Sequence, residues 1–183
     1  MSAAVVLSKD DLRAVAAFAA ASAETVLEIF EADQPGDSRP RDAIAAAWAF
    51  ARGGERGKVL RDTAWAALKA AQNAHTAAGR EAARAAMAAA GAAYLHPLAK
   101  ATQVKHILGA GAHAARAAEL IAGGSAAGHL ERTVRRATPA VTDVLRRYPA
   151  APDGGGRVGE LIRVLDADLR PPRTTTPAPA TRS

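Results

Sequence analysis

The chain has 183 residues, of which 49% are hydrophobic and only 4% are aromatic, and alanine dominates the hydrophobic set. Because alanine is the best helix former and is depleted in strands, this composition argues against an all-β fold. The absence of cysteine excludes disulfides, thiolate metal sites and cysteine nucleophiles, and the net charge of +6 leaves an acidic or nucleic-acid partner open.

The first half of the chain predicts four helices, each bounded by glycine or proline. Apolar residues recur at three- and four-residue spacing over 8–32, which predicts a helix with Ser8 as its N-cap. Three more helices are expected over 38–52, over 57–78 and over 80–96.

The second half predicts three further helices. A fifth helix is expected over 97–122, and a sixth over 128–148 that bends or restarts at Pro139. Three consecutive glycines then indicate a flexible loop over 153–157. A last helix over 157–169 carries its large apolar residues on one face.

These elements predict an all-α fold, a compact single-domain bundle of about six or seven mostly antiparallel helices over residues 1–170. Residues 171–183 are rich in Pro and Thr and contain no apolar residue larger than Ala, so we expect a disordered tail. Charges interrupt residues 1–30, and no apolar stretch reaches the length of a bilayer. We therefore expect neither a signal peptide nor a membrane segment, and a cytoplasmic location.

Three of the five histidines fall between residues 94 and 120, surrounded by alanine and glycine. His106, Gly109 and His113 recur at three- and four-residue spacing, so they share one stripe of the predicted helix. The two histidines are two turns apart, about 10 Å along the helix axis, which is too far for one ion. Zinc-binding helices use histidines four residues apart, and this pair is absent, so we predict no metal site.

Two interpretations of these histidines stay open. In one, His106 or His113 does general acid–base work, since an unperturbed imidazole titrates near pH 6.5. In the other, one ring is a hydrogen-bonded core or boundary group, the other is solvated, and Gly109 lets a neighbouring helix pack closely. The second interpretation predicts a neutral His106 at pH 7. The sequence also lacks a Walker-type loop, a G-x-S-x-G turn and an H-E-x-x-H helix, so we predict no catalytic residue and no cofactor.

Arginines gather on the predicted sixth helix. Arg135 and Arg146 are eleven residues apart, which is nearly a whole number of turns, so the set could form a phosphate-binding stripe. A solvated face is the commoner reason for such a pattern, and no aromatic residues interleave to stack bases. We therefore expect weak, non-specific nucleic-acid binding at most. The set comprises Arg132, Arg135, Arg136, Arg146 and Arg147.

Three stretches together resemble a known family. "RPRDAIAAAWAFARG" resembles the opening of the Imm-five-like domain of actinobacterial immunity proteins. "AAQNAHTAAGREAARAAMAAAGAA" is similar to the alanine-rich middle of that domain, and "QVKHILGAGAHAARA" is similar to its later helix. The resemblance covers roughly residues 10–125, and His113 departs from it, since an aromatic residue is more usual there. The matching positions are Arg39, Pro40, Arg41, Ile44, Trp48, His75, His106 and Gly109.

The resemblance implies an all-α fold and the neutralisation of a toxin. Relatives are also labelled as an exonuclease subunit, but the missing nucleotide-binding loop argues against that label here. Our first hypothesis is therefore a non-enzymatic binding protein that neutralises or sequesters a cognate toxin or another protein. Its candidate binding residues are Arg39, Arg41, Trp48, His75, His106 and Gly109.

Two alternatives remain. The chain could be a small-molecule-binding protein or enzyme of a specialised biosynthetic pathway, with Arg39, Arg41, His75 and His106 lining a polar pocket. It could also be a nucleic-acid-associated protein that uses the arginines of the sixth helix. A pocket beside His106 that is deeper than a surface groove would favour the small molecule. A flat exposed face near Trp48 would favour the protein partner.

Overall fold

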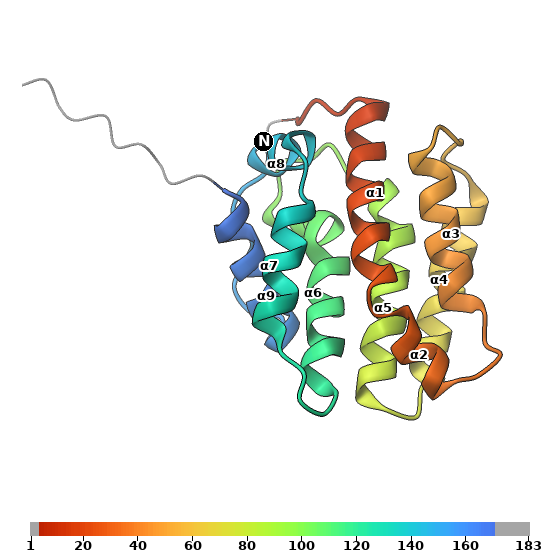
Figure 1. The fold of residues 1–183 in the computed structure, drawn as a ribbon. Helices are drawn as coiled ribbons and strands as arrows, with labels where there is room; N and C mark the ends of the chain where they lie inside the picture. The colour runs from red at the N-terminus through yellow and green to blue at the C-terminus, as the bar shows by residue number, and fades with distance from the viewer. Residues whose placement is uncertain (1–3, 171–183) are drawn as a thin grey trace, which may run out of the picture.

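The computed structural model describes residues 4–170, and this part of the chain is all-helical (Figure 1). Two 3₁₀ helices, η1 (Ala92–Tyr94) and η2 (Ala101–Gln103), lie between the fifth and sixth of its α-helices. The predicted all-α class is confirmed. The α-helices are α1 (Lys9–Glu24), α2 (Leu27–Asp33), α3 (Arg39–Ala51), α4 (Lys58–Asn73), α5 (Ala77–Gly91), α6 (Val104–Leu120), α7 (Ala126–Arg136), α8 (Pro139–Arg146) and α9 (Gly156–Leu169).

The helices α5 and α6 form the centre of the bundle. α5 packs against α1, α2, α3, α4 and α6, and α6 also packs against α7 and α9. In Figure 1, α3 and α4 lie on one side of this central pair, and α7, α8 and α9 lie on the other. The N-terminal helix α1 packs on both central helices and so joins the two sides.

Alanine makes this close packing achievable. A methyl side chain lets two helix axes approach closely, although each such contact buries little area. Larger apolar groups, among them Phe30, Leu108 and Leu165, are fully buried around the central pair. The buried residues of α5 are almost all small: Ala78, Gly79, Glu81, Ala82, Ala83, Ala85, Ala86, Ala89 and Ala90.

The described residues contain nine α-helices, whereas the sequence predicted six or seven, because two predicted helices are each divided in two. The predicted helix over 8–32 is interrupted after Glu24, where the Thr25 hydroxyl donates to the Ser22 carbonyl at 2.6 Å. The predicted helix over 128–148 restarts at Pro139, as proposed from the sequence, and the Thr138 side chain caps the new helix.

The third predicted helix ends earlier than expected. α4 stops at Asn73, and the Asp33 carboxylate accepts hydrogen bonds from the backbone N–H groups of His75 and Thr76, each at 2.8 Å. Gly79, expected to end a helix, instead lies in the first turn of α5. A Cβ atom there would lie 2.8 Å from the Asp33 side chain, so this close approach requires glycine.

The other helices are also shifted from their predicted bounds. The fifth predicted helix, over 97–122, begins only at Val104, after the 3₁₀ helix η2. Its preceding loop is held by the Tyr148 hydroxyl, which donates to the His96 carbonyl at 2.7 Å. The last helix begins at Gly156, inside the predicted loop 153–157.

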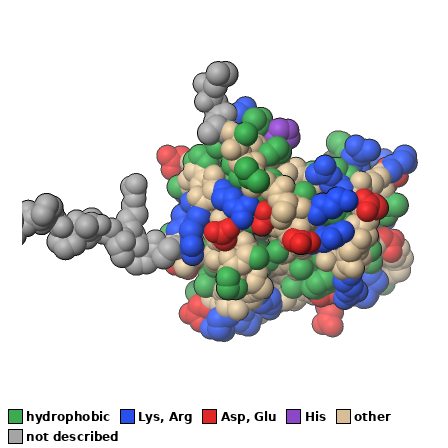
Figure 2. Space-filling view, turned by 90° about the horizontal axis from the view of Figure 1, so that it is seen from above, with side chains coloured by type: hydrophobic (Ala, Val, Ile, Leu, Met, Phe, Trp, Pro, Cys, Tyr) green, Lys and Arg blue, Asp and Glu red, His purple; other side chains and the backbone are tan. Residues whose placement is uncertain are grey.

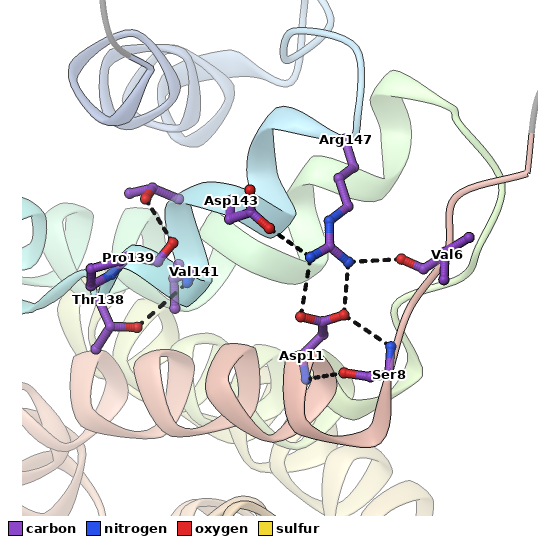
Figure 3. A network of polar contacts seen from close by, with 9 residues as sticks. Val6, Ser8, Asp11, Thr138, Pro139, Val141, Asp143 and Arg147 are labelled. Carbon is purple, nitrogen blue, oxygen red and sulfur yellow. Dashed lines mark hydrogen bonds and ion pairs between the residues drawn. The ribbon is translucent and has the colours of Figure 1, made fainter.

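An arginine joins the end of α8 to the start of α1 (Figure 3). Arg147, which follows α8, donates to both carboxylate oxygens of Asp11 on α1, at 2.7 and 3.3 Å. It also donates to Asp143 at 2.6 Å and to the Val6 carbonyl at 2.7 Å. The hydrogen bond from Arg147 holds the pKa of the Asp11 carboxyl below its ordinary value.

Figure 2 looks onto the end of the bundle at which α1 begins, and there Lys and Arg side chains lie beside Asp and Glu side chains. Within the described residues, no helix is long and apolar enough to cross a membrane. The predicted disordered tail, residues 171–183, lies outside the described residues.

Candidate functional site

An apolar pocket of about 440 Å³ lies between α4, α5 and α6. The helices α4 and α6 each pack on α5, and the pocket occupies the space between them over α5. Its lining residues are Arg61, Ala64, Trp65 and Leu68 of α4, Met87, Ala88 and Gly91 of α5, Tyr94 of η1, Lys105, His106, Gly109 and His113 of α6, and Ile162 of α9.

Small residues give the pocket its depth. A Cβ atom built at Gly109 would contact only the Ala88 methyl group, at 3.8 Å, and one at Gly91 would meet nothing within 4 Å. The prediction that Gly109 permits close helix packing is therefore wrong. That role belongs to Gly111, whose Cβ would lie 2.9 Å from Thr133 Cγ2.

His106 is half-buried in the pocket wall. Burial lowers the pKa of its imidazole, and the positive charge of Lys105 lowers it further. The Gly91 backbone raises the pKa but does not outweigh these two effects. The lowered pKa favours the neutral form at pH 7, the state expected from the sequence.

His113 lines the same pocket but has a charged partner. Its Nδ1 donates to Glu81 Oε2 at 2.6 Å, and the other oxygen of this carboxylate accepts from Arg84 at 2.8 Å. Burial raises the pKa of the Glu81 carboxyl, but the contacts with His113 and Arg84 outweigh it, so the pKa lies below its usual value. The sequence did not predict this partner, which lies 32 residues away on α5.

The end of the pocket nearest η1 is basic. Tyr94 is fixed there because its hydroxyl donates to the Gly57 carbonyl at 2.8 Å. The guanidinium carbons of Arg56 and Arg61 lie 5.6 and 5.9 Å from the centre of its ring. A second cavity of about 390 Å³ adjoins the pocket, shares Arg61 and Tyr94 with it, and adds Arg56.

Trp65 stands at the rim of the pocket, and 65% of its surface is exposed. A large aromatic group left in solvent beside an apolar pocket is typical of a surface that binds a partner or ligand. The pocket lining contains no Ser, Thr or Cys. The arrangement offers apolar walls, two imidazoles and a basic end.

The structure does not bring the other candidate residues to this pocket. Arg39, at the start of α3, binds the Asp37 carboxylate through two nitrogens, and the shorter contact is 2.6 Å. Arg41 is exposed and pairs with Glu31, also at 2.6 Å. Neither arginine lines the pocket around His106, so the polar pocket expected from these residues does not form.

Trp48 and His75 also lie elsewhere. Trp48 is half-buried on α3, and the guanidinium carbon of Arg52 lies 5.0 Å from the centre of its ring. His75 was expected on the apolar face of a helix, but it lies in the turn after α4 and is exposed. Its backbone N–H, rather than its ring, makes the contact with Asp33.

The predicted arginine stripe is divided between two helices. Arg135 lies on α7 and Arg146 on α8. Because the helix is interrupted between them, the eleven-residue spacing does not place them on one helical face. Arg135 pairs with Glu131 at 3.8 Å, and Arg147 is occupied by two carboxylates. The geometry thus removes the main support for a phosphate-binding stripe.

Arg61, Trp65 and Tyr94 line the pocket but were not predicted from the sequence. One signal was available: Arg61, Trp65 and Leu68 recur at four- and three-residue spacing on α4, and tryptophan is rare in this chain. The spacing places them on one stripe beside the buried face. Nothing in the sequence indicated that this stripe faces His106 on α6.

Similarity to known proteins is found at the level of a family. No curated protein and no solved structure matches the chain. The model of one family matches residues 6–139, which is more than half of the chain. The matched segment includes every residue of the pocket except Ile162. The resemblance described above is thereby confirmed, and the chain belongs to the family described as "Imm-5 like putative immunity protein".

Proposed function

We propose that this chain is a non-enzymatic binding protein that neutralises a protein partner by taking an apolar side chain of that partner into the pocket between α4, α5 and α6. The carrying observation is the exposed Trp65 at the rim of an apolar pocket with small residues in its floor. Interface energy concentrates where aromatic side chains meet such pockets. The immunity family supports a toxin as the partner.

This proposal moves the binding surface away from Trp48. A flat exposed face there would have favoured a protein partner, but Trp48 is half-buried with Arg52 against its ring. Trp65 provides the exposed aromatic group instead. The proposal treats residues 1–170 as one domain acting in the cytoplasm, with 171–183 taking no part in binding.

The test is to fill the pocket. Gly109→Leu places a branched side chain where only the Ala88 methyl group is near, so the fold should tolerate it while the cavity is lost. The partner is first identified by pull-down, and the complex is then reconstituted from purified proteins. We expect Gly109→Leu and Trp65→Ala each to weaken this complex about tenfold or more.

Ala45→Leu is the matched control, because Ala45 is exposed on α3, outside the pocket lining. It should bind the partner as the unmodified protein does. An unchanged affinity in Gly109→Leu, with the fold intact by thermal melt, would show that the pocket is not the binding site.

A second candidate function is the binding of a small molecule. The pocket volume of about 440 Å³ is in the range typical of small-molecule sites, and it lies beside His106, where a pocket was expected to favour this reading. A compound bound there should raise the melting temperature of the unmodified protein and not that of Gly109→Leu. Loss of a protein complex in the same variant would instead favour the first candidate.

A further inference from the structure

We propose that the pocket recognises an apolar side chain that is followed by a carboxylate, with the apolar group between α4 and α6 and the carboxylate against Arg56 and Arg61. This inference rests on the proposed function and names the chemistry of the partner segment, an apolar anchor beside Asp or Glu. It follows from the arrangement of two adjoining cavities and from the charges around them.

The two cavities share a wall. The apolar pocket of about 440 Å³ and the neighbouring cavity of about 390 Å³ are both lined by Arg61 and Tyr94. A group that fills the first cavity therefore ends next to the second. The second cavity adds Arg56 and Gly57 to this shared wall. The lining therefore changes from mainly apolar in the first cavity to basic in the second, with Tyr94 lining both.

The bases at this end lack a carboxylate partner. Within residues 4–170, Arg56, Arg61 and Lys105 take part in no ion pair, and Arg56 makes only a 3.3 Å hydrogen bond to the Ala93 carbonyl. Neither cavity has an Asp or Glu in its lining. The acids beside them in the chain pair with lysines, Glu55 with Lys9 and Asp62 with Lys58.

Two other arginines of the protein are each shared by two carboxylates. Arg147 is shared by Asp11 and Asp143, and Arg157 by Glu119 and Glu160. At the pocket, two guanidiniums stand beside one tyrosine ring with their charge uncompensated, and a carboxylate accepts hydrogen bonds from guanidinium more strongly than a neutral acceptor does.

A matched pair of probes tests the inference. The dipeptides acetyl-Phe-Glu-amide and acetyl-Phe-Gln-amide carry the same apolar anchor and differ only in the charge of the neighbouring group. Each is titrated into the ¹⁵N-labelled full chain, and the indole N–H signal of Trp65 is followed by NMR. We expect the glutamate probe to bind about fivefold to tenfold more tightly, and the preference to shrink as salt is added.

The variants locate the preference. The double change Arg56→Gln with Arg61→Gln should abolish the advantage of the glutamate probe, so that the two probes bind this variant with the same affinity. Arg146→Gln is the control, because Arg146 is exposed on α8 and outside both linings. It should keep the full preference.

The outcomes separate the two proposals. Equal binding of the two probes, or a preference that survives the double change, overturns the carboxylate site and leaves the apolar pocket intact. Failure of both probes to shift the Trp65 signal at millimolar concentration counts against the pocket as a binding site, and so against the proposed function as well.

Discussion

Gly109 and Gly111, two residues apart on α6, have opposite surroundings. A Cβ at Gly111 would lie 2.9 Å from Thr133 Cγ2 and 3.4 Å from Leu165 Cδ1, so this glycine lets α7 and α9 pack against α6. A Cβ at Gly109 would meet only the Ala88 methyl group at 3.8 Å. Gly111 therefore lies where helices approach closely, whereas Gly109 lies in the floor of the pocket. The same residue type thus allows close packing on one face and leaves space for a cavity on the other.

Basic side chains on the two sides of α6 can also be compared by the partners that they have. The packed side is fastened by shared ion pairs, with Arg147 joining α8 to α1 and Arg157 joining α9 to Glu119 on α6. The hydrogen bond from Arg157 is the main reason that the pKa of Glu119 is lowered to about 2. At the basic end of the pocket, Arg56, Arg61 and Lys105 take part in no ion pair within the described residues.

The strongest test of the comparison exchanges the two glycines in turn for leucine. Gly111→Leu should destabilise the fold by about 3 kcal/mol, because the added side chain overlaps Thr133 and Leu165. In a protein of this size that corresponds to a melting temperature roughly 6–12 °C lower. Gly109→Leu should stay within about 1 kcal/mol of the unmodified protein. Similar melting temperatures for the two variants would show that the two glycines do not differ in how tightly their surroundings are packed.

A second test uses His129, which is buried on the packed side and contacts the Thr25 hydroxyl at 3.1 Å. Burial, reinforced by the charges of Arg132 and Arg136, lowers the pKa of its imidazole to about 4. The unfolded chain, with a pKa near 6.5, therefore binds this proton more readily than the folded one. Stability should fall as the pH drops from about 6.5 to 4, by about 1–3 kcal/mol from this group.

Denaturant titrations at pH 7.0, 6.0 and 5.0 measure that loss. His129→Gln keeps a polar side chain but cannot titrate, so its stability should vary less with pH over this window. His106→Gln, on the pocket side, is the comparison. An equally steep pH dependence in His129→Gln would assign the acid sensitivity to other groups.

A third, smaller effect distinguishes paired from unpaired arginines. Arg147→Gln should cost about 1 kcal/mol, because it removes contacts with Asp11, Asp143 and the Val6 carbonyl. Arg61→Gln should leave the free energy of unfolding nearly unchanged, since that side chain is exposed and makes no ion pair within the described residues. Urea titration of both variants measures the difference. A cost at Arg61 equal to that at Arg147 would mean that the pocket side is also fastened by its charges.

The smallest expected effect concerns neither face. Deletion of residues 171–183 should leave the melting temperature nearly unchanged, because a Pro- and Thr-rich segment without large apolar residues has little surface to bury. Thermal denaturation followed by circular dichroism is the measurement. A clear loss of stability would show that these residues pack on the bundle.

Local signals in the sequence predicted most of the helices. Apolar spacing, with proline and glycine as boundaries, located α3 and α5 and the restart at Pro139. The break between α1 and α2 was missed, because no proline or glycine marks it in the sequence. Spacing along a helix reports which residues share a stripe, and that information placed His106 and Gly109 together correctly.

Contacts between helices could not be read in this way. His113 and Glu81 meet across 32 residues, and Trp65 faces His106 from another helix. The close-packing role was assigned to Gly109 rather than to Gly111 for the same reason: the two glycines lie about 200° apart around the helix, but the sequence does not say which neighbour lies in either direction. Arg39 and Arg41, conspicuous in the sequence, pair with carboxylates near the start of α3.

The contact between Asp11 and Arg147 spans 136 residues, which has a consequence during synthesis. At about 5–20 residues per second, Asp11 is made roughly 7–27 s before Arg147. Over that interval its carboxylate has a nearby partner, because Asp11 Oδ2 accepts the backbone N–H of Ser8 and the Ser8 hydroxyl accepts the N–H of Asp11. This local pair can start α1 on the ribosome, and the late arginine then docks onto a helix end that is already formed.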